Sequence, residues 1–309
     1  MTTTPNHVPE SDLLAELEPV VAEGLDRHLA VAREWFPHEM VPYEQGRSYA
    51  EEPWQDRDSH LSDIARTALE VNLLTEDNLP YYHLALWNLF GRDGAWGEWV
   101  RRWTAEEGRH AIAIRDFLTV TRGIDPTVLE RGRMDHVSRG YYPEGLTGPL
   151  DGVVYTTLQE LATRISHRNT GAITDDAAAE RLMSRIAVDE NLHYVFYREL
   201  GSALVDLDPS AMVLAMRRQV IGFAMPGLEI PGFKQKAIQM AKAGIYDYRI
   251  HHDQVIAPVI LKRWGLMELE GLSDDAKAAR DEIVMFMGAL DAAARRYEDK
   301  RAAASTPDR

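Results

Sequence analysis

The chain has 309 residues, of which 45% are hydrophobic and 27% are charged, and its formal net charge is −15. This composition is typical of a soluble globular protein with one large core or two modest ones. The acidic balance disfavours general nucleic-acid binding, which needs a cationic surface. The sequence contains no cysteine, which excludes disulfides, thiolate zinc sites and protein-held iron–sulfur clusters. Any metal would therefore be bound by histidine and carboxylate side chains.

No stretch reaches the roughly 20 apolar residues that span a bilayer, and the N-terminus lacks the positive start and apolar run of a secretory signal. We therefore expect no membrane span and a cytoplasmic location.

Apolar residues recur every three or four positions along most of the chain, which is the period of an amphipathic helix. We predict an all-α protein. The predicted helices cover residues 11–34, 61–90, 95–122, 150–170, 176–204, 208–224, 232–247, 250–264 and 273–302, with a kink at Pro80. Breaks rich in glycine and proline are expected at 91–94, 140–149 and 225–232. Because each break is too short for a domain linker, we predict one domain over residues 1–298 and a frayed tail over residues 299–309.

Two fragments, TAEEGRHAIAI (104–114) and AVDENLHYVFY (187–197), share one skeleton of two adjacent acids, two further residues, a histidine and a mostly apolar run. In a helix, residues three apart lie one turn from each other, so Glu107 with His110, and Glu190 with His193, could each reach one ion. One such pair alone would be explained by a solvated face or a local hydrogen bond. Two pairs that interrupt apolar stripes favour a cation, because a buried carboxylate without a partner is costly.

The preceding helices repeat the pattern with one inward glutamate each. Glu76 precedes Glu107 by 31 residues, and Glu160 precedes Glu190 by 30 residues. Four helices thus supply four carboxylates and two imidazoles, the donor set known for ferritin-like di-iron and di-manganese bundles. Four carboxylates neutralise two divalent cations, and oxygen and nitrogen ligands without sulfur suit iron or manganese. We predict a ferritin-like helical bundle with a four-helix core that holds two metal ions, and with additional packing helices; the resemblance described next implies that this core is a di-iron core.

Four sequence blocks around these residues also resemble those of a known family. LLTEDNLPYYH (73–83), RWTAEEGRH (102–110), QELATRISHRNTG (159–171) and VDENLH (188–193) together resemble the soluble acyl-acyl-carrier-protein desaturases, especially their actinobacterial branch, and the resemblance runs from about residue 14 to 270. It implies that two Fe ions are bound by Glu76, Glu107, His110, Glu160, Glu190 and His193. Glu107 and Glu190 would bridge the two metals.

The resemblance implies roles for four further residues. The Thr163 hydroxyl could relay a proton to reduced oxygen, and Asp189 would orient a histidine ligand. Trp35 and Trp103 match buried tryptophans near that network. Thr163 could equally hydrogen-bond a carbonyl one turn back, and Trp103 could be ordinary core packing. We assign no role to His83, His167, His251 or His252.

The implied reaction is the insertion of a cis double bond into a saturated fatty acyl chain on acyl carrier protein, with dioxygen and two electrons from a ferredoxin. The implied assembly is a homodimer. Leu86, Leu89 and Val153 are candidates for the wall of an apolar channel, or for ordinary core. Asn191 and Leu192 stand where plant enzymes carry basic residues, so other basic patches are candidates for docking the carrier: Arg101, Arg102, Arg217, Arg218, Lys234 and Lys236.

Three alternatives stay open at this point. Coenzyme A thioesters could replace the carrier-bound substrate. A different di-iron oxygenase, such as an N-oxygenase or hydroxylase, would use the same ligands on another substrate. A ferritin-like iron-handling protein would assemble into a cage and would have no deep acyl channel.

Overall fold

The computed structural model describes residues 10–141 and 145–304, and within these residues the regular structure is entirely helical. The predicted all-α class is confirmed. The longer helices are α1 (Glu10–Val31), α3 (Asp63–Glu76), α4 (Leu79–Phe90), α5 (Gly94–Val120), α6 (Pro126–Arg139), α7 (Pro149–Ala172), α8 (Ala177–Leu207), α9 (Pro209–Ile221), α10 (Phe233–Lys242), the π-helix η3 (His251–Arg263) and α12 (Asp274–Ala304). Short helices are α2 (Pro37–Met40), η1 (Tyr43–Gln45), η2 (Asp56–Asp58) and α11 (Tyr248–Ile250).

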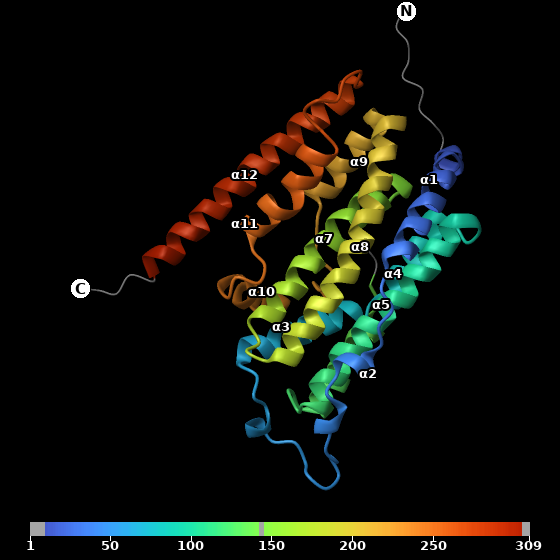
Figure 1. The fold of residues 1–309 in the computed structure, drawn as a ribbon. Helices are drawn as coiled ribbons and strands as arrows, with labels where there is room; N and C mark the ends of the chain where they lie inside the picture. The colour runs from blue at the N-terminus through green and yellow to red at the C-terminus, as the bar shows by residue number, and fades with distance from the viewer. Residues whose placement is uncertain (1–9, 142–144, 305–309) are drawn as a thin grey trace, which may run out of the picture.

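Four of these helices form the centre of the molecule. Helix α7 packs along α8, α8 contacts α5, α5 contacts α3, and α3 contacts α7, so the four close a bundle (Figure 1). Helix α1 lies against α5 and α8, whereas α9, η3 and α12 form a further layer beside α7 and α8. The four central helices are the ones that carry the repeated acidic and histidine motifs.

Two apolar clusters occupy the two ends of this bundle. Along α5, residues 96–103 belong to the larger cluster and residues 113–118 to the second one. Along α8, residues 179–186 belong to the second cluster and residues 194–205 to the larger one. The acid and histidine motifs at 107–110 and 190–193 therefore form a polar layer between two regions of apolar core. The prediction of one domain over residues 1–298 stays a prediction, and the larger cluster, which draws on helices from α1 to α12, favours it.

The predicted kink at Pro80 is wrong, because the segment 61–90 forms two helices. Helix α3 ends at Glu76, and α4 begins at Leu79 with Pro80 in its first turn. A proline there removes no intrahelical hydrogen bond, whereas in a helix interior it would remove one. The chain therefore uses Pro80 to start a helix.

Helix α6 was not predicted. Its local signal is clear, since Asp125 Oδ1 accepts hydrogen bonds from the amides of Thr127 (2.8 Å) and Val128 (3.3 Å), and Pro126 fills the first helical position. Only Leu129 and His136 are buried, so the apolar periodicity is weak. A mostly solvated helix leaves little trace in a pattern based on apolar spacing.

The breaks lie where they were expected, and the C-terminus differs from the expectation. Helices end at Phe90, Arg139 and Ile221 and resume at Gly94, Pro149 and Phe233, although residues 142–144 lie outside the described part of the break at 140–149. Helix α12 continues to Ala304, so residues 299–304 are helical, and 305–309 lie outside the described residues. In the part of the chain that the structure describes, we find no helix with the length and hydropathy needed to cross a bilayer.

The contact between α8 and η3 has no room for a larger residue at Gly201. A Cβ atom there would lie 2.3 Å from Cζ2 of the buried Trp264, whose indole nitrogen donates a 3.1 Å hydrogen bond to the Arg198 carbonyl. We therefore expect Gly201→Ala to lower the free energy of unfolding, measured by urea denaturation, by about 1–3 kcal/mol.

The control for this variant is Gly288→Ala. Gly288 lies on the exposed side of α12, where an added Cβ meets no atom within 4 Å. The control should raise the free energy of unfolding by up to about 1 kcal/mol, because alanine favours the helix. Equal changes in the two variants would contradict the packing argument.

Candidate metal centre

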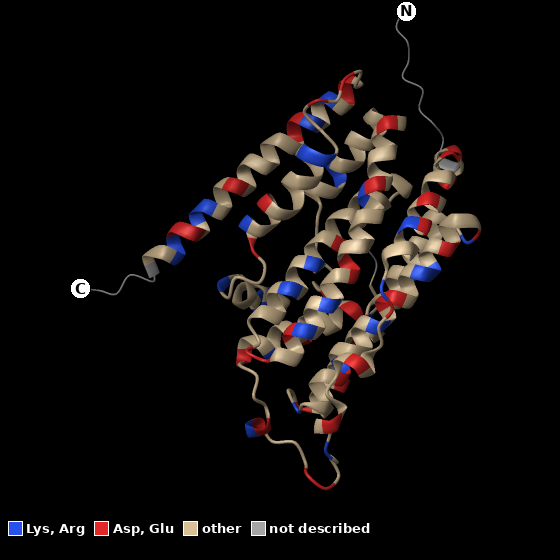
Figure 2. Ribbon diagram, viewed as in Figure 1, with Lys and Arg blue, Asp and Glu red and all other residues tan. Residues whose placement is uncertain are grey.

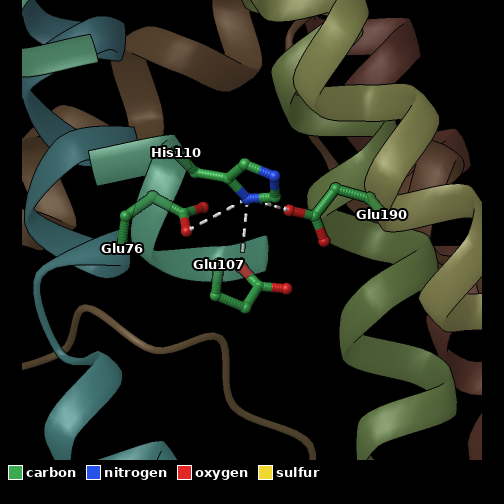
Figure 3. Close-up of side chains that lie close together, drawn as sticks. All are labelled: Glu76, Glu107, His110 and Glu190. Atoms are coloured by element: carbon green, nitrogen blue, oxygen red, sulfur yellow. Dashed lines mark hydrogen bonds and ion pairs between the residues drawn. The ribbon is translucent and has the colours of Figure 1, made fainter. Parts of the chain in front are cut away.

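Six of the residues singled out in the sequence converge in the polar layer. Their oxygen and nitrogen atoms form two groups in which all donor atoms lie within 4.8 Å of one another, and every member is buried: Glu76, Glu107, His110 and Glu190 in one, and Glu107, Glu160, Glu190 and His193 in the other. Figure 3 shows the first group, with His110 facing three carboxylates that come from α3, α5 and α8. Two residues, Glu107 and Glu190, belong to both groups.

Both histidines turn the same ring nitrogen toward the carboxylates. His110 Nδ1 lies 3.0 Å from Glu107 Oε2 and 3.3 Å from Glu190 Oε1. His193 Nδ1 lies 2.8 Å from Glu107 Oε1 and 3.6 Å from Glu160 Oε2. The two oxygens of Glu107 therefore face different histidines, which is the orientation a carboxylate needs to bridge two ions.

Several atoms at the centre of the cluster are buried without a hydrogen-bond partner among the described residues. They are Glu107 Oε1, Glu160 Oε2, Glu190 Oε1 and His193 Nδ1. Leaving such acceptors unpaired is costly, and a pair of acceptors at 2.8 Å repels unless a cation or proton lies between them. The donor set thus fits a bound metal of the kind that oxygen and imidazole ligands favour.

The protonation equilibria of the cluster are strongly perturbed. Burial, with the nearby charge of Glu190, raises the pKa of Glu107 and raises that of Glu160 well above its usual range. Burial disfavours the charged imidazoles of His110 and His193, but the surrounding carboxylates outweigh it and raise both pKa values well above the ordinary histidine value. Burial also opposes the ionisation of Glu76 and Glu190, but hydrogen bonds from His110 outweigh it and lower the pKa of both. Glu107 and Glu160 are therefore the carboxylates that retain protons unless metal cations replace them.

The acid that precedes each repeated glutamate serves the histidine of the other repeat. Asp189 Oδ2 lies 3.3 Å from His110 Nε2, and Glu106 Oε2 lies 2.9 Å from His193 Nε2. An ionised carboxylate only accepts, so each imidazole donates from Nε2 and directs Nδ1 at the cluster. The expectation that Asp189 lies beside a histidine agrees with this geometry, whereas Glu106 was missed. The signal for it was the pair of adjacent acids in both fragments.

Both of these acids are held as anions. Burial opposes ionisation, but the hydrogen bond from His110 lowers the pKa of Asp189, and the hydrogen bonds from His193 and His28 hold the pKa of Glu106 far below its usual range. Arg109 Nη2 lies 3.1 Å from Asp189, and Arg102 Nη2 lies 2.5 Å from Glu106. Each histidine is thus supported by a carboxylate that is itself neutralised by an arginine.

Hydrogen bonds from α5 and α7 reach two of the glutamates. Trp103 Nε1 donates to Glu160 Oε1 at 2.9 Å. The Thr163 hydroxyl lies 2.8 Å from Glu190 Oε2 and 3.1 Å from the carbonyls of Gln159 and Glu160. Both interpretations of Thr163 therefore have a partner in the structure, one in the cluster and one in the helix backbone.

His167, to which we assigned no role, belongs to the cluster's surroundings. Its Nε2 atom lies 2.9 Å from Glu76 Oε1 and 3.6 Å from Glu190 Oε1, and the side chain is buried. It follows Glu160 by seven residues, which is two helical turns, so the signal for it was its place on the inward stripe of α7. His83 contacts Thr104 and His252 contacts Asp253, both outside the two groups.

Two small apolar cavities lie on either side of this layer along α7. The first is lined by Val71, Asn72, Thr75, Thr163, Ser166, Met225, Pro226, Phe233, Ala237, Met240 and Tyr246. The second is lined by Tyr82, Ala85, Leu86, Trp103, Leu146, Tyr155, Thr156, Gln159 and Pro226. Of the three expected channel residues, Leu86 lines the second cavity, whereas Leu89 and Val153 pack in the core.

Most members of the expected basic patches are engaged within the chain. Arg102 pairs with Glu106, Arg217 with Glu282, Arg218 with Asp151 and Lys236 with Glu70, and Arg101 donates to the Arg92 carbonyl. Lys234 is exposed on α10. Figure 2 shows basic and acidic residues interspersed along the helices. A solvated, paired surface explains these residues better than a dedicated basic face does.

The fold and the cluster together define a class: a ferritin-like helical bundle with a buried carboxylate and histidine site that could hold metal. Comparison with known proteins specifies it further. The family model described as fatty acid desaturase matches residues 9–308, and the chain belongs to this family.

Individual relatives agree with this assignment. A Mycobacterium tuberculosis protein named as the acyl-[acyl-carrier-protein] desaturase DesA1 is 45% identical over 299 residues, which cover 93% of this chain and 87% of the relative. The chloroplastic stearoyl-[acyl-carrier-protein] 9-desaturase of Gossypium hirsutum is 28% identical, covering 96% and 76% of the two chains. The crystal structure of M. tuberculosis DesA2 superposes with a TM-score of 0.69 at 29% identity, covering 83% of this chain and 96% of that one.

The cluster geometry leads to a metal-binding prediction. Purified protein should bind about two Fe²⁺ ions per chain, and Glu107→Ala should lower the affinity for both ions because Glu107 belongs to both groups. Glu76→Ala should lower the affinity for one ion only. Equilibrium dialysis with metal analysis measures this, and Glu130→Ala on α6, outside both groups, is the control. Two tightly held ions in Glu107→Ala would contradict the ligand assignment.

Metal affinity should also depend on pH. The raised pKa values of His110 and His193 mean that these groups hold protons at neutral pH in the metal-free protein, and a metal at Nδ1 must displace them. Affinity should therefore rise with pH, by about tenfold per pH unit for each proton displaced. Calorimetric titration in buffers of different ionisation enthalpy measures the protons released. Binding without proton release between pH 6 and 8 would contradict the prediction.

Proposed function

We propose that this desaturase inserts a cis double bond into a saturated fatty acyl chain carried on acyl carrier protein. Two Fe ions would be held by Glu76, Glu107, His110, Glu160, Glu190 and His193, of which Glu107 and Glu190 belong to both groups of donor atoms. The observation that carries the proposal is the buried cluster of unpartnered acceptor atoms in a chain of the fatty acid desaturase family. The relatives named as acyl-[acyl-carrier-protein] desaturases supply the substrate class.

The reaction balances with dioxygen and an external reductant. Two hydrogen atoms leave adjacent methylenes of the acyl chain, and together with two electrons and two protons they convert dioxygen into two water molecules. The di-iron centre, when bound, supplies the redox chemistry that activates dioxygen. Because the chain has no cysteine for an iron–sulfur cluster, we assign the electron supply to a separate ferredoxin-type protein.

The chain's own residues would bind and orient the acyl chain. The cavity lined by Thr163 reaches the cluster through the Thr163–Glu190 hydrogen bond, and the cavity lined by Trp103 reaches it through the Trp103–Glu160 hydrogen bond. Pro226 lines both cavities, so an acyl chain that parts the side chains there would pass beside the cluster. Fixing the chain in such a passage is what selects the methylenes that react.

Two polar groups would handle protons, one in the wall of the first cavity and one behind a histidine of the cluster. The Thr163 hydroxyl touches Glu190 and also lines the first cavity, so it can hold or donate a proton at Oγ1 beside the reacting carbons. Asp189 would keep the proton of His110 on Nε2 and so leave Nδ1 free for metal. We further propose a cytoplasmic homodimer.

The decisive experiment is turnover of defined substrates. Iron-loaded protein is incubated with saturated acyl carrier protein thioesters of several chain lengths, ferredoxin, its reductase and dioxygen, and the acyl products are analysed by mass spectrometry. We expect a product two mass units lighter, formed only when all components are present. Matched coenzyme A thioesters show whether the carrier protein is required.

A variant in the second cavity distinguishes binding of the acyl chain from binding of the metal. Ala85→Phe adds a ring to the cavity wall, so it should lower turnover of the preferred chain length by about 100-fold while two irons are retained. Absence of unsaturated product at every chain length, together with oxidation of an amine or hydroxylation, would favour another di-iron oxygenase. Iron uptake into an assembled cage without turnover would favour an iron-handling protein.

A further inference from the structure

Each histidine of the cluster is supported by a carboxylate and an aromatic side chain, but the residue types differ between the two sides. On one side, the Trp35 indole donates a 2.7 Å hydrogen bond to Asp189 Oδ2, and its ring stacks at 6.3 Å and 12° over His110. On the other side, His28 Nε2 lies 3.0 Å from Glu106 Oε2, and its ring stacks at 5.9 Å and 23° over His193. His28 thus takes the place at Glu106 that Trp35 takes at Asp189.

We propose that His28 of α1 is a positioning residue for the metal ion on the His193 side of the cluster. This inference rests on the proposed metal site. Acting through Glu106, His28 would fix the ring plane of His193 and keep its Nδ1 atom directed at Glu107 and Glu160.

The contacts of Glu106 leave its carboxylate little freedom. Its Oε2 atom accepts from both His28 (3.0 Å) and His193 (2.9 Å), while Arg102 lies 2.5 Å from Oε1. Removing the His28 donor would leave a buried anion, only 3% exposed as a residue, with one contact fewer and free to rotate toward Arg102. The hydrogen bond that orients His193 would then weaken, because both depend on the same oxygen.

The ring of His28 is itself held in place. It packs edge-on against Trp99 with ring centroids 5.1 Å apart, and both side chains are buried between α1 and α5. Because ionised Glu106 only accepts, His28 must donate from Nε2, and its Nδ1 atom lies buried without a hydrogen-bond partner among the described residues. Keeping an unpaired nitrogen in the core is costly. That cost favours a role for the hydrogen bond that His28 Nε2 donates to Glu106.

The arrangement makes the two ions separable by mutation outside the ligand set. His28 supports the side of the cluster that contains Glu160, and Trp35 supports the side that contains Glu76. Loss of a hydrogen-bonding partner behind a metal ligand typically costs about 10–100-fold in metal affinity. We therefore expect loss of His28 to lower the affinity for one ion by that factor and to leave the affinity for the other ion unchanged.

The test is titration of metal-free protein with Co²⁺, followed by equilibrium dialysis and by the visible absorption of the bound ion. Wild-type protein should bind two ions, His28→Leu should bind one of them about 10–100-fold more weakly, and His28→Gln, whose amide can donate to Glu106, should recover most of the loss. The control is Leu25→Ala, on the same buried face of α1 one turn earlier. It should lower thermal stability while both cobalt affinities stay unchanged.

Double variants identify which ion is affected. The loss of cobalt-binding free energy in His28→Leu should add in full to the loss in Glu76→Gln. It should add only partly to the loss in Glu160→Gln, because residues that bind or support the same ion are coupled. Unchanged affinities in His28→Leu, or equal weakening of both ions in His28→Leu and Leu25→Ala, would overturn the inference while the proposed function stands. Wild-type protein that binds fewer than two ions would overturn the proposed function as well.

Discussion

The structure depends on the burial of four carboxylates in one small volume. Removing such charges from water is costly, and their mutual repulsion adds to the cost. The protein offsets this with two imidazoles inside the cluster and with arginines one layer further out, at Glu106 and Asp189. The remaining unpaired oxygens call for cations. The layer is placed between two large apolar clusters, so the helices that carry it are held together independently of any ion.

The internal repeat explains how so many ligands are oriented with few residues. Each repeat supplies an inward glutamate, a paired acid and a histidine, but its paired acid supports the histidine of the opposite repeat. The two repeats are therefore connected by these acid–histidine contacts as well as by the shared glutamates. The residues that contact the two supporting acids are not repeated, since Trp35, which contacts Asp189, follows α1, whereas His28, which contacts Glu106, lies within it. The local chemistry of the two sides thus differs although the ligands are alike.

Much of the site could be predicted from the sequence, because the helical period puts Glu107 with His110, and Glu190 with His193, on one face each. Apolar neighbours on the same stripes then indicate which face is inward. Partners from other helices could not be predicted in this way. Glu106 and His28 are 78 residues apart, and no periodic pattern records that α1 brings them to 3.0 Å. Helix α6 was missed for a related reason, since spacing of apolar residues reports buried faces and α6 buries little.

The surroundings that make the carboxylates costly are also those that the proposed oxidation requires. A reaction that removes hydrogen from an unactivated methylene must exclude water and side chains that would compete for the oxidant. Both cavities beside the cluster have largely apolar walls, and the two wall residues that contact the glutamates, Thr163 and Trp103, are each engaged by a hydrogen bond. The same dry space therefore raises the pKa of Glu107 and Glu160, favours divalent cations in place of protons, and excludes the water that would divert the oxidant from the acyl chain.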